Sequence, residues 1–198
     1  MPNVDRPMGL IPVRHVSGRP YTGSHRMYLC EASNAIYVGD PVKSAGSAGA
    51  AGTHVNGVNC EGMPTIDRAA AGDTILGVVV GFLPLQSDLT LLYKAATSAK
   101  RIALVVDDPD VVFEIQEDSV GNDIAATQVN NNFDMAAWTA GTSQGVSAVE
   151  LDSSDATGTA TAQFRLVGLV NRPDNAIGTN AKWEVLINEH EYKTTTGV

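Results

Sequence analysis

The sequence predicts an all-β fold of the sandwich or barrel type, and three features of the chain support this prediction. Valine outnumbers leucine 22 to 13, β-branched residues recur in short runs, and Gly, Pro, Asn and Asp separate these runs as turn residues do. No amphipathic helical segments alternate with the runs, which disfavours a parallel α/β fold. Roughly eight or more short strands joined by turns are typical of a β-sandwich or a barrel.

Residues 183–189 form the clearest predicted strand. Apolar Trp183, Val185 and Ile187 alternate there with polar residues, which is the period of two expected when one face of a strand is in water. The same alternation occurs in residues 111–116. Further strands are predicted over residues 27–31, 75–80, 89–93, 101–106, 146–151 and 163–170, and of these 75–80 and 101–106 are expected to be buried on both faces.

The first twenty residues are predicted to form an extended N-terminal arm, residues 1–20. Four prolines in this segment exclude a helix and restrict the residues before them to extended geometry. The arm carries the apolar residues Met8, Leu10, Ile11 and Val13. It is expected either to pack on its own domain or to lie across a neighbouring subunit.

A single β domain is predicted to follow over residues 21–192, with a short C-terminal tail over 193–198. Two stretches depart from the strand pattern inside this domain. Residues 44–59 are rich in Gly and Ala, which predicts a flexible loop. Residues 122–145 form an Asn-rich insert in which at most a short helical turn is expected.

Charge and hydropathy exclude several classes of partner. The formal net charge is −9 and the isoelectric point is about 4.7, and Lys and Arg are scattered singly, so neither nucleic acid nor an anionic membrane is an expected partner. No apolar run approaches the length of a membrane-spanning helix. The N-terminus lacks the basic and apolar regions of a secretory signal, so we expect a cytoplasmic product.

Residues 141–145 match the GxSxG pattern of a catalytic serine and place Ser143 at its centre. Candidate acids (Asp152, Asp155 or Asp174) and His190 follow in the order that hydrolases use. That motif needs a buried strand before the serine and a helix after it, whereas a polar Asn-rich segment precedes this one and a predicted strand follows. A simple turn is therefore the preferred interpretation.

Two acidic clusters are candidate sites for a hard cation. Asp107, Asp108 and Asp110 flank a proline after a buried strand, but their spacing does not match a calcium loop. A turn capped by its own aspartates is the preferred interpretation, and the same holds for residues 152–155.

No metal centre and no cofactor site are predicted. His15, His25, His54 and His190 are far apart and match no metal-ligand spacing. Cys30 and Cys60 form neither a disulfide framework nor a metal-binding pair, so buried free thiols are expected. The Gly/Ala-rich stretch lacks the Gly-Lys-Ser/Thr ending of a phosphate-binding loop.

Residues 171–175 are expected to be a polar turn whose Arg172 either forms a salt bridge with Asp174 or reaches a partner.

Five segments of the chain carry a family resemblance: PNVDRPMGLIPVRHVSG at the N-terminus, VGDPVK at 38–43, GDTILGVVVGF at 72–82, VVDDPDVVFEIQED in the centre and FRLVGLVNRPDNAIGTNAKWEVLINEHEY near the C-terminus. Together they resemble the cement or decoration (minor head) proteins of tailed bacteriophages with podovirus-like heads. The likeness covers nearly the full chain. The C-terminal segment is its most specific part, and residues 130–160 contribute little.

The resemblance implies a β-sandwich, jelly-roll-like or β-tulip-like module without catalytic activity. Such a module binds the outer surface of an assembled head as homotrimers at three-fold and quasi-three-fold positions. The implied partners are the major capsid protein and further copies of the chain, and the implied location is the virion, after synthesis in the bacterial cytoplasm. The residues expected to contact the capsid or a neighbouring copy are Pro7, Met8, Leu10, Ile11, Pro12, Val13, Arg14, His15 and Arg172.

Three other functions remain as alternatives. A virion-surface β-sandwich that recognises host glycan is favoured by exposed Tyr or Trp platforms, but aromatic residues make up only 6% of the chain. A hydrolase built on Ser143 is tested by loss of esterase activity on substitution of that serine. A head-tail or tail component is distinguished by a low, ring-like copy number in the virion.

Overall fold

The computed structural model describes residues 3–97, 99–154 and 161–193, and its strands confirm the predicted all-β class. The strands are β1 Ile11–His15, β2 Arg26–Cys30, β3 Pro41–Ala48, β4 His54–Val55, β5 Val58–Asn59, β6 Pro64–Arg68, β7 Gly77–Phe82, β8 Arg101–Val106, β9 Val111–Gln116, β10 Asn132–Phe133, β11 Phe164–Leu169 and β12 Lys182–Ile187. Two 3₁₀ helices, Ala126–Gln128 and Glu191–Lys193, complete the described elements. Over the described ranges, no helix has the length and apolar character needed to cross a membrane.

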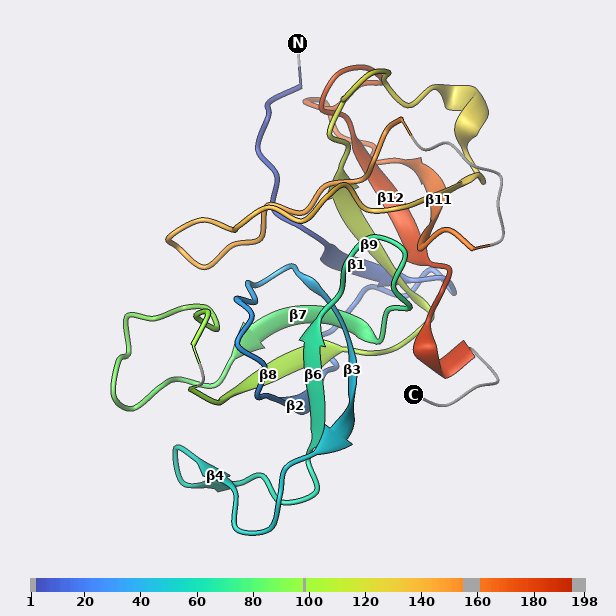
Figure 1. The fold of residues 1–198 in the computed structure, drawn as a ribbon. Helices are drawn as coiled ribbons and strands as arrows, with labels where there is room; N and C mark the ends of the chain where they lie inside the picture. The colour runs from blue at the N-terminus through green and yellow to red at the C-terminus, as the bar shows by residue number, and fades with distance from the viewer. Residues whose placement is uncertain (1–2, 98, 155–160, 194–198) are drawn as a thin grey trace.

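Five strands close into a small barrel in the order β2-β6-β3-β7-β8 (Figure 1). The β2–β6 pair is parallel and the other pairs are antiparallel. Small and branched apolar side chains such as Val42, Ile66, Val79 and Ala103 fill the barrel and are completely buried. The barrel therefore has a packed interior and encloses no channel.

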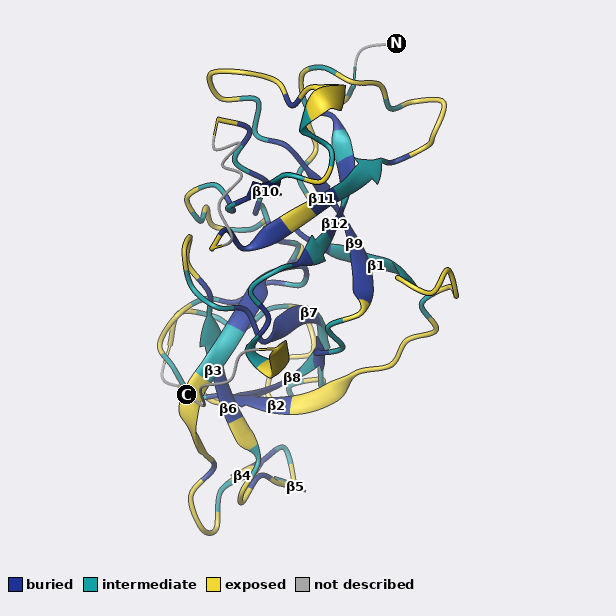
Figure 2. Ribbon diagram, turned by 90° about the vertical axis from the view of Figure 1, so that its right-hand side faces the viewer, coloured by how far each residue is buried: buried dark blue, intermediate teal, exposed yellow. Residues whose placement is uncertain are grey.

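The other five strands form an antiparallel sheet in the order β1-β9-β12-β11-β10. One face of this sheet packs against the outside of the barrel, because Phe113 and Trp183 from the sheet share a buried cluster with Val78 and Val106 from the barrel. Figure 2 shows these buried segments between the two bodies. Alternation along β12 buries Trp183, Val185 and Ile187, as its sequence predicts.

Several predicted strands agree with the structure and two do not. Residues 101–106 and 111–116 match β8 and β9, and the predictions over 27–31, 75–80, 163–170 and 183–189 overlap β2, β7, β11 and β12. The predictions over 89–93 and 146–151 are wrong. Residues 89–93 form turns, since the guanidinium of Arg101 binds the carbonyl oxygens of Leu91 and Tyr93. Residues 146–151 are joined to other segments only by isolated bridges.

The prediction of a flexible loop over residues 44–59 is also wrong. Strand β3 continues to Ala48, and β4 and β5 pair as a hairpin at the end of the molecule (Figure 2). The small residues serve close packing instead: a Cβ atom on Gly49 would lie 2.0 Å from the carbonyl oxygen of Cys60. Low side-chain bulk therefore allows two backbone segments to approach each other here.

The Asn-rich segment 122–145 contributes to the core. Ile124, Phe133 and Met135 from this segment are buried with the sheet, and β10 pairs with β11. Its helical turn is the 3₁₀ helix Ala126–Gln128. The sequence concealed this role because polar residues, including Asn130 to Asn132 and Asp134, separate the three apolar residues from one another.

Candidate protein-binding surfaces

The N-terminal arm packs on its own chain, which is one of the two placements left open by the sequence. Its residues Ile11–His15 form β1, an edge strand paired with β9. The side-chain amide of Asn3 donates hydrogen bonds to the carbonyl oxygens of Ala176, at 2.8 Å, and Thr179, at 2.9 Å. Arg6 N–H donates to the side-chain oxygen of Gln116 at 3.0 Å. The arm is thus fastened along the length of the sheet.

Two glycines fasten the arm to the barrel where the two segments cross. Leu10 N–H donates to the carbonyl oxygen of Gly39 at 2.9 Å, and the Leu10 side chain is buried. Both Gly9 and Gly39 have positive φ, at 66° and 97°. A Cβ on Gly9 would lie 2.5 Å from the Gly39 oxygen, and one on Gly39 would lie 2.5 Å from the Met8 oxygen. Glycine is therefore required at both positions by conformation and by space.

The arm residues predicted to contact a partner differ in their accessibility. Leu10 is buried in the core, and Met8 is exposed. The others predicted from the arm are half-buried, and they are Pro7, Ile11, Pro12, Val13, Arg14 and His15. Met8 is therefore the one exposed apolar residue among these predicted contacts, and elsewhere in the arm Val4 and Val16 are exposed as well.

The fold brings Arg14 and Arg172 together on the face of the five-stranded sheet that points away from the core. Glu114 of β9 and Glu184 of β12 lie directly opposite each other on this face. Arg172 binds Glu114 at 3.0 Å and Arg14 binds Glu184 at 2.6 Å. The arginines therefore neutralise a like-charge cross-strand pair that would otherwise destabilise the sheet. Arg172 also contacts Asp174 at 3.5 Å, one of the two outcomes expected for it.

Ser143 lies in an exposed turn, and the geometry differs from that of a catalytic serine. Thr142 N–H donates to the Val146 oxygen at 2.7 Å and Gly145 N–H to the Thr142 oxygen at 2.9 Å, so the segment folds back on itself without entering a helix. Among the candidate triad residues, His190 is buried, its Nδ1 accepts the Tyr192 N–H at 3.1 Å, and burial lowers its pKa to about 4.

The candidate acids of that triad are engaged elsewhere. Asp152 accepts hydrogen bonds from the backbone and hydroxyl of Ser154, as an aspartate that caps its own turn does. Asp174 binds Arg172. Asp155 lies outside the described residues. Ser143 and these groups therefore do not form a catalytic arrangement within the part of the chain that the structure describes.

The three aspartates after β8 contact three different basic side chains. Asp107 contacts Arg26 at 3.4 Å, Asp108 contacts His15 at 3.4 Å, and Asp110 contacts Lys193 at 3.5 Å. Asp108 also caps the turn by accepting the Asp110 N–H at 2.9 Å. Their carboxylates are thus used to hold β1, β2 and the C-terminal segment near this turn.

The remaining candidate ligands are also dispersed. Cys30 and Cys60 are buried free thiols, and burial raises the pKa of Cys30 to about 12, so it is unreactive at neutral pH. Across residues 3–97, 99–154 and 161–193, the acidic, histidine and cysteine side chains form no group able to hold a metal ion.

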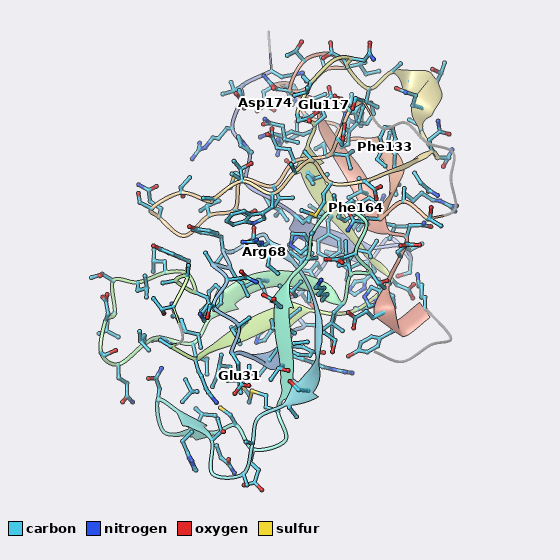
Figure 3. The ribbon with its side chains drawn as sticks, viewed as in Figure 1. Glu31, Arg68, Glu117, Phe133, Phe164 and Asp174 are labelled. Carbon is cyan, nitrogen blue, oxygen red and sulfur yellow. The ribbon has the colours of Figure 1, made fainter. Side chains whose placement is uncertain are left out.

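Sequence reasoning missed two groups of exposed apolar side chains. The first, the apolar tip, consists of Val4, Val120 and Ile177, which are 70%, 64% and 50% exposed. Hydrogen bonds from Asn3 to residues 176–179, and from Asn180 N–H to the Ser119 hydroxyl, bring their three segments together. The tip lies at the end of the sheet farthest from the barrel, near Asp174 (Figures 1 and 3).

The second group, the leucine surface, consists of Leu89 and Leu92, which are 72% and 54% exposed. Both belong to the loop of residues 83–97, which connects β7 to β8 and projects from the side of the barrel (Figure 1). Its leucines suggested a strand, so periodicity alone gave no signal of an exposed surface.

Both tryptophans are engaged within the chain. Trp183 is completely buried. Trp138 is half-buried beneath Arg68, whose guanidinium carbon lies 3.7 Å from the centre of the indole ring (Figure 3). Tyr37 and Tyr93 stack on each other beside it, with ring centres 4.7 Å apart. These aromatic rings stabilise the junction of barrel and sheet, an ordinary structural use of cation–π and stacking contacts.

No protein-family model matches the chain, and no curated protein and no solved structure is significantly similar to it. The surfaces described above are therefore the basis on which a function is assigned to it. They are loops and a strand edge held on a rigid β framework, an arrangement suited to binding.

Proposed function

We propose that this chain is a cement protein of a phage head. It binds the outer surface of the assembled shell, as trimers at three-fold and quasi-three-fold positions, and stabilises the shell against the pressure of the packaged DNA. The observation that carries this proposal is the presence of two separate exposed apolar groups, the apolar tip and the leucine surface, on one rigid body. A molecule that bridges neighbours needs at least two docking surfaces.

Mass action explains how such a protein stabilises a shell. A subunit that contacts two neighbouring capsomers binds only the assembled state, so its binding free energy favours that state over separated capsomers. Three linked subunits add avidity, since the second and third contacts form at high effective concentration.

Charge supports an external location. The net charge of −9 disfavours contact with packaged DNA, and it keeps a protein soluble on an exposed surface. On the sheet face, Arg14 and Arg172 are engaged in ion pairs with Glu184 and Glu114.

The glycan-binding alternative receives little support, because neither tryptophan is exposed as a platform for a sugar ring, and Tyr192, which is 52% exposed, is in contact with the Arg26 guanidinium and the Tyr28 hydroxyl. A head-tail or tail component has the same need for docking surfaces. It differs from a cement protein in copy number, which is ring-like for a tail component and similar to that of the major capsid protein for a cement protein.

The test is to add the purified chain to heads produced without it and to measure co-sedimentation. The proposal predicts saturable binding at a fixed ratio to the major capsid protein. It also predicts a higher temperature of DNA release from the decorated heads. No binding, or saturation at a ring-sized copy number, would contradict it.

Point substitutions are better than deletion of the arm for locating the capsid contact, because residues 11–15 form β1 and Leu10 belongs to the core. The double variant Val4→Ser, Ile177→Ser removes apolar contact area from the tip and is expected to weaken head binding about tenfold or more. The control is Val16→Ser, a similarly exposed valine on the loop after β1. Equal binding by both variants would exclude the tip as the docking surface.

A further inference from the structure

The leucine surface combines protruding side chains with a groove. Leu89 and Leu92 stand at the rim of a groove of about 350 Å³, which is lined by apolar residues that include Phe82, Leu91 and Val146. Figure 1 shows that the loop of residues 83–97 lies beside the turn that contains residues 141–145, and both segments line the groove. The surface thus has convex and concave apolar parts next to each other.

Two buried cations fix the shape of this loop. Arg101 donates hydrogen bonds to the carbonyl oxygens of Leu83, Leu91 and Tyr93 at 2.9, 3.0 and 2.6 Å. Lys94 is also buried, and its ammonium group donates to the oxygens of Ala32, Ala95 and Thr97 at 3.0, 2.8 and 2.7 Å.

The hydrogen-bond acceptors of these two cations are all neutral backbone carbonyls. Burial of a cation without a counter-ion is costly, and it also lowers the pKa of Lys94. The hydrogen bonds from Arg101 and Lys94 hold the loop in one conformation. Its exposed leucines therefore lose little conformational entropy when a partner binds. A preorganised apolar surface of this kind is a docking surface.

The charges around the leucine surface indicate a second copy of this chain as the partner. None of the residues that line the groove is acidic, and the guanidinium of Arg101 is directed to backbone oxygens. Asp88 is the one acidic residue in the sequence from 83 to 97, and its carboxylate is bound by the backbone and hydroxyl of Thr90. Copies of a chain with net charge −9 repel each other, and a face whose groove lining has no carboxylate and whose loop carries only Asp88 is one where they approach with little repulsion.

We propose that the leucine surface binds the leucine surface of a second copy of this chain, with Leu89 of one copy inserted against the groove of the other. The contact supplies the association between copies that the proposed cement role requires, and in that sense it rests on the proposed function. Because the knob and the groove lie side by side, each copy inserts its Leu89 against one neighbour and receives the Leu89 of another, and a head-to-tail contact of this kind closes into a ring of three copies.

Sedimentation velocity of the full chain over a range of concentrations tests this contact without any capsid. The wild-type chain is expected to associate, and more tightly at high salt, because salt screens the repulsion between acidic copies while an apolar contact persists. The double variant Leu89→Ser, Leu92→Ser is expected to raise the dissociation constant about tenfold or more. The matched control Val4→Ser, Ile177→Ser is expected to associate like the wild type.

Three results would overturn the proposal: a wild-type chain that stays monomeric at every concentration, a leucine variant that associates as well as the wild type, or association that weakens with salt. Unchanged circular dichroism of the variants confirms that exposed substitutions leave the fold intact. Failure of head binding with intact self-association would contradict the cement role alone, and the reverse result would contradict this contact alone.

Cross-linking gives an independent readout of the same contact. Cys30 and Cys60 are buried, so Leu89→Cys introduces an exposed thiol into a chain whose own thiols are protected. A short bis-maleimide is expected to link two copies through position 89, whereas Ile177→Cys at the tip is expected to give far less linked product. Equal yields at the two positions would contradict the proposed contact.

Discussion

At the residue scale, Gly9 and Gly39 show how one pair of small residues holds the arm to the barrel. Their positive φ angles and their contacts with backbone oxygens leave no room for a side chain. In the sequence they are two of 19 glycines, and nothing in their neighbours marks them as a crossing point. Their role depends on two segments that are thirty residues apart, so it becomes visible only in the folded chain.

Gly39→Ala is expected to lower the free energy of unfolding by about 2–4 kcal/mol, because it adds both left-handed strain and a clash with the Met8 oxygen. Thermal or denaturant unfolding measures the change. The matched control is Gly168→Ala in β11, where φ is ordinary and a Cβ atom would meet open space. Its effect is expected to stay within about 1 kcal/mol. Equal destabilisation by the two variants would contradict the crossing-point assignment.

Glu117 gives a second residue-scale prediction, concerning pH. It is completely buried, and this burial raises its pKa to about 7, although the N–H groups of Ile124 and Ala181 donate to it. Because the folded pKa exceeds the unfolded one, the protonated carboxyl stabilises the fold at low pH. That contribution is lost as the pH rises through the folded pKa.

Glu117→Gln is expected to gain stability relative to the wild type as the pH rises from about 5 to about 8, by about 2 kcal/mol. His190 acts in the opposite direction, since its lowered pKa removes stability as the pH falls below its unfolded value, but it is common to both proteins and cancels in the difference. Urea unfolding at several pH values measures the effect. Glu61→Gln, at an exposed position, serves as the control and is expected to show no such trend.

At the element scale, the sequence predicted strands best where the chain alternates or is continuously apolar. Strands β8, β9 and β12 have these patterns and were found nearly residue for residue. Strands β1 and β3 were missed because Pro12 and the Gly/Ala run carry low strand propensity, and pairing with neighbouring strands overrides it. A local sequence pattern does not contain the information about which strands will pair in the folded chain.

The loop of residues 83–97 shows the opposite error. Its leucines fit a strand pattern, yet Arg101 and Lys94 bind its carbonyl oxygens from the side and hold it as a series of turns. Nothing in the sequence marks these two cations as buried, because single lysines and arginines are ordinarily exposed. Only the structure shows that both are buried and bound to carbonyl groups.

Lys94→Met is expected to destabilise the chain by about 2–4 kcal/mol, because three carbonyl oxygens lose their donor. Hydrogen exchange is expected to accelerate mainly within residues 83–97. Lys100→Met is the control: Lys100 forms an exposed ion pair with Glu31, at the barrel (Figure 3), whose loss is expected to cost less than about 1 kcal/mol. Uniform acceleration across the barrel would show that Lys94 stabilises the whole fold instead of this loop.

At the scale of the whole molecule, the sheet and the barrel form one body that carries two apolar surfaces in different places (Figure 1). The sequence predicted the fold class and an arm. It also predicted several arm residues and Arg172 as contact residues; of these, Leu10 is buried, Met8 and Arg172 are exposed, and the other arm residues are half-buried. The apolar tip was not predictable, because it arises from three segments distant in the sequence that meet only through hydrogen bonds of Asn3 and Asn180.

Cryo-electron microscopy of the intact phage particle tests the cement role most directly. The account predicts density for this barrel-and-sheet fold on the outer surface of the head, at three-fold and quasi-three-fold positions. The apolar tip is expected to face the capsid and the leucine surfaces of neighbouring copies to meet. Density for the fold inside the shell, in the tail or at the head-tail junction, with none on the outer surface of the head, would contradict it.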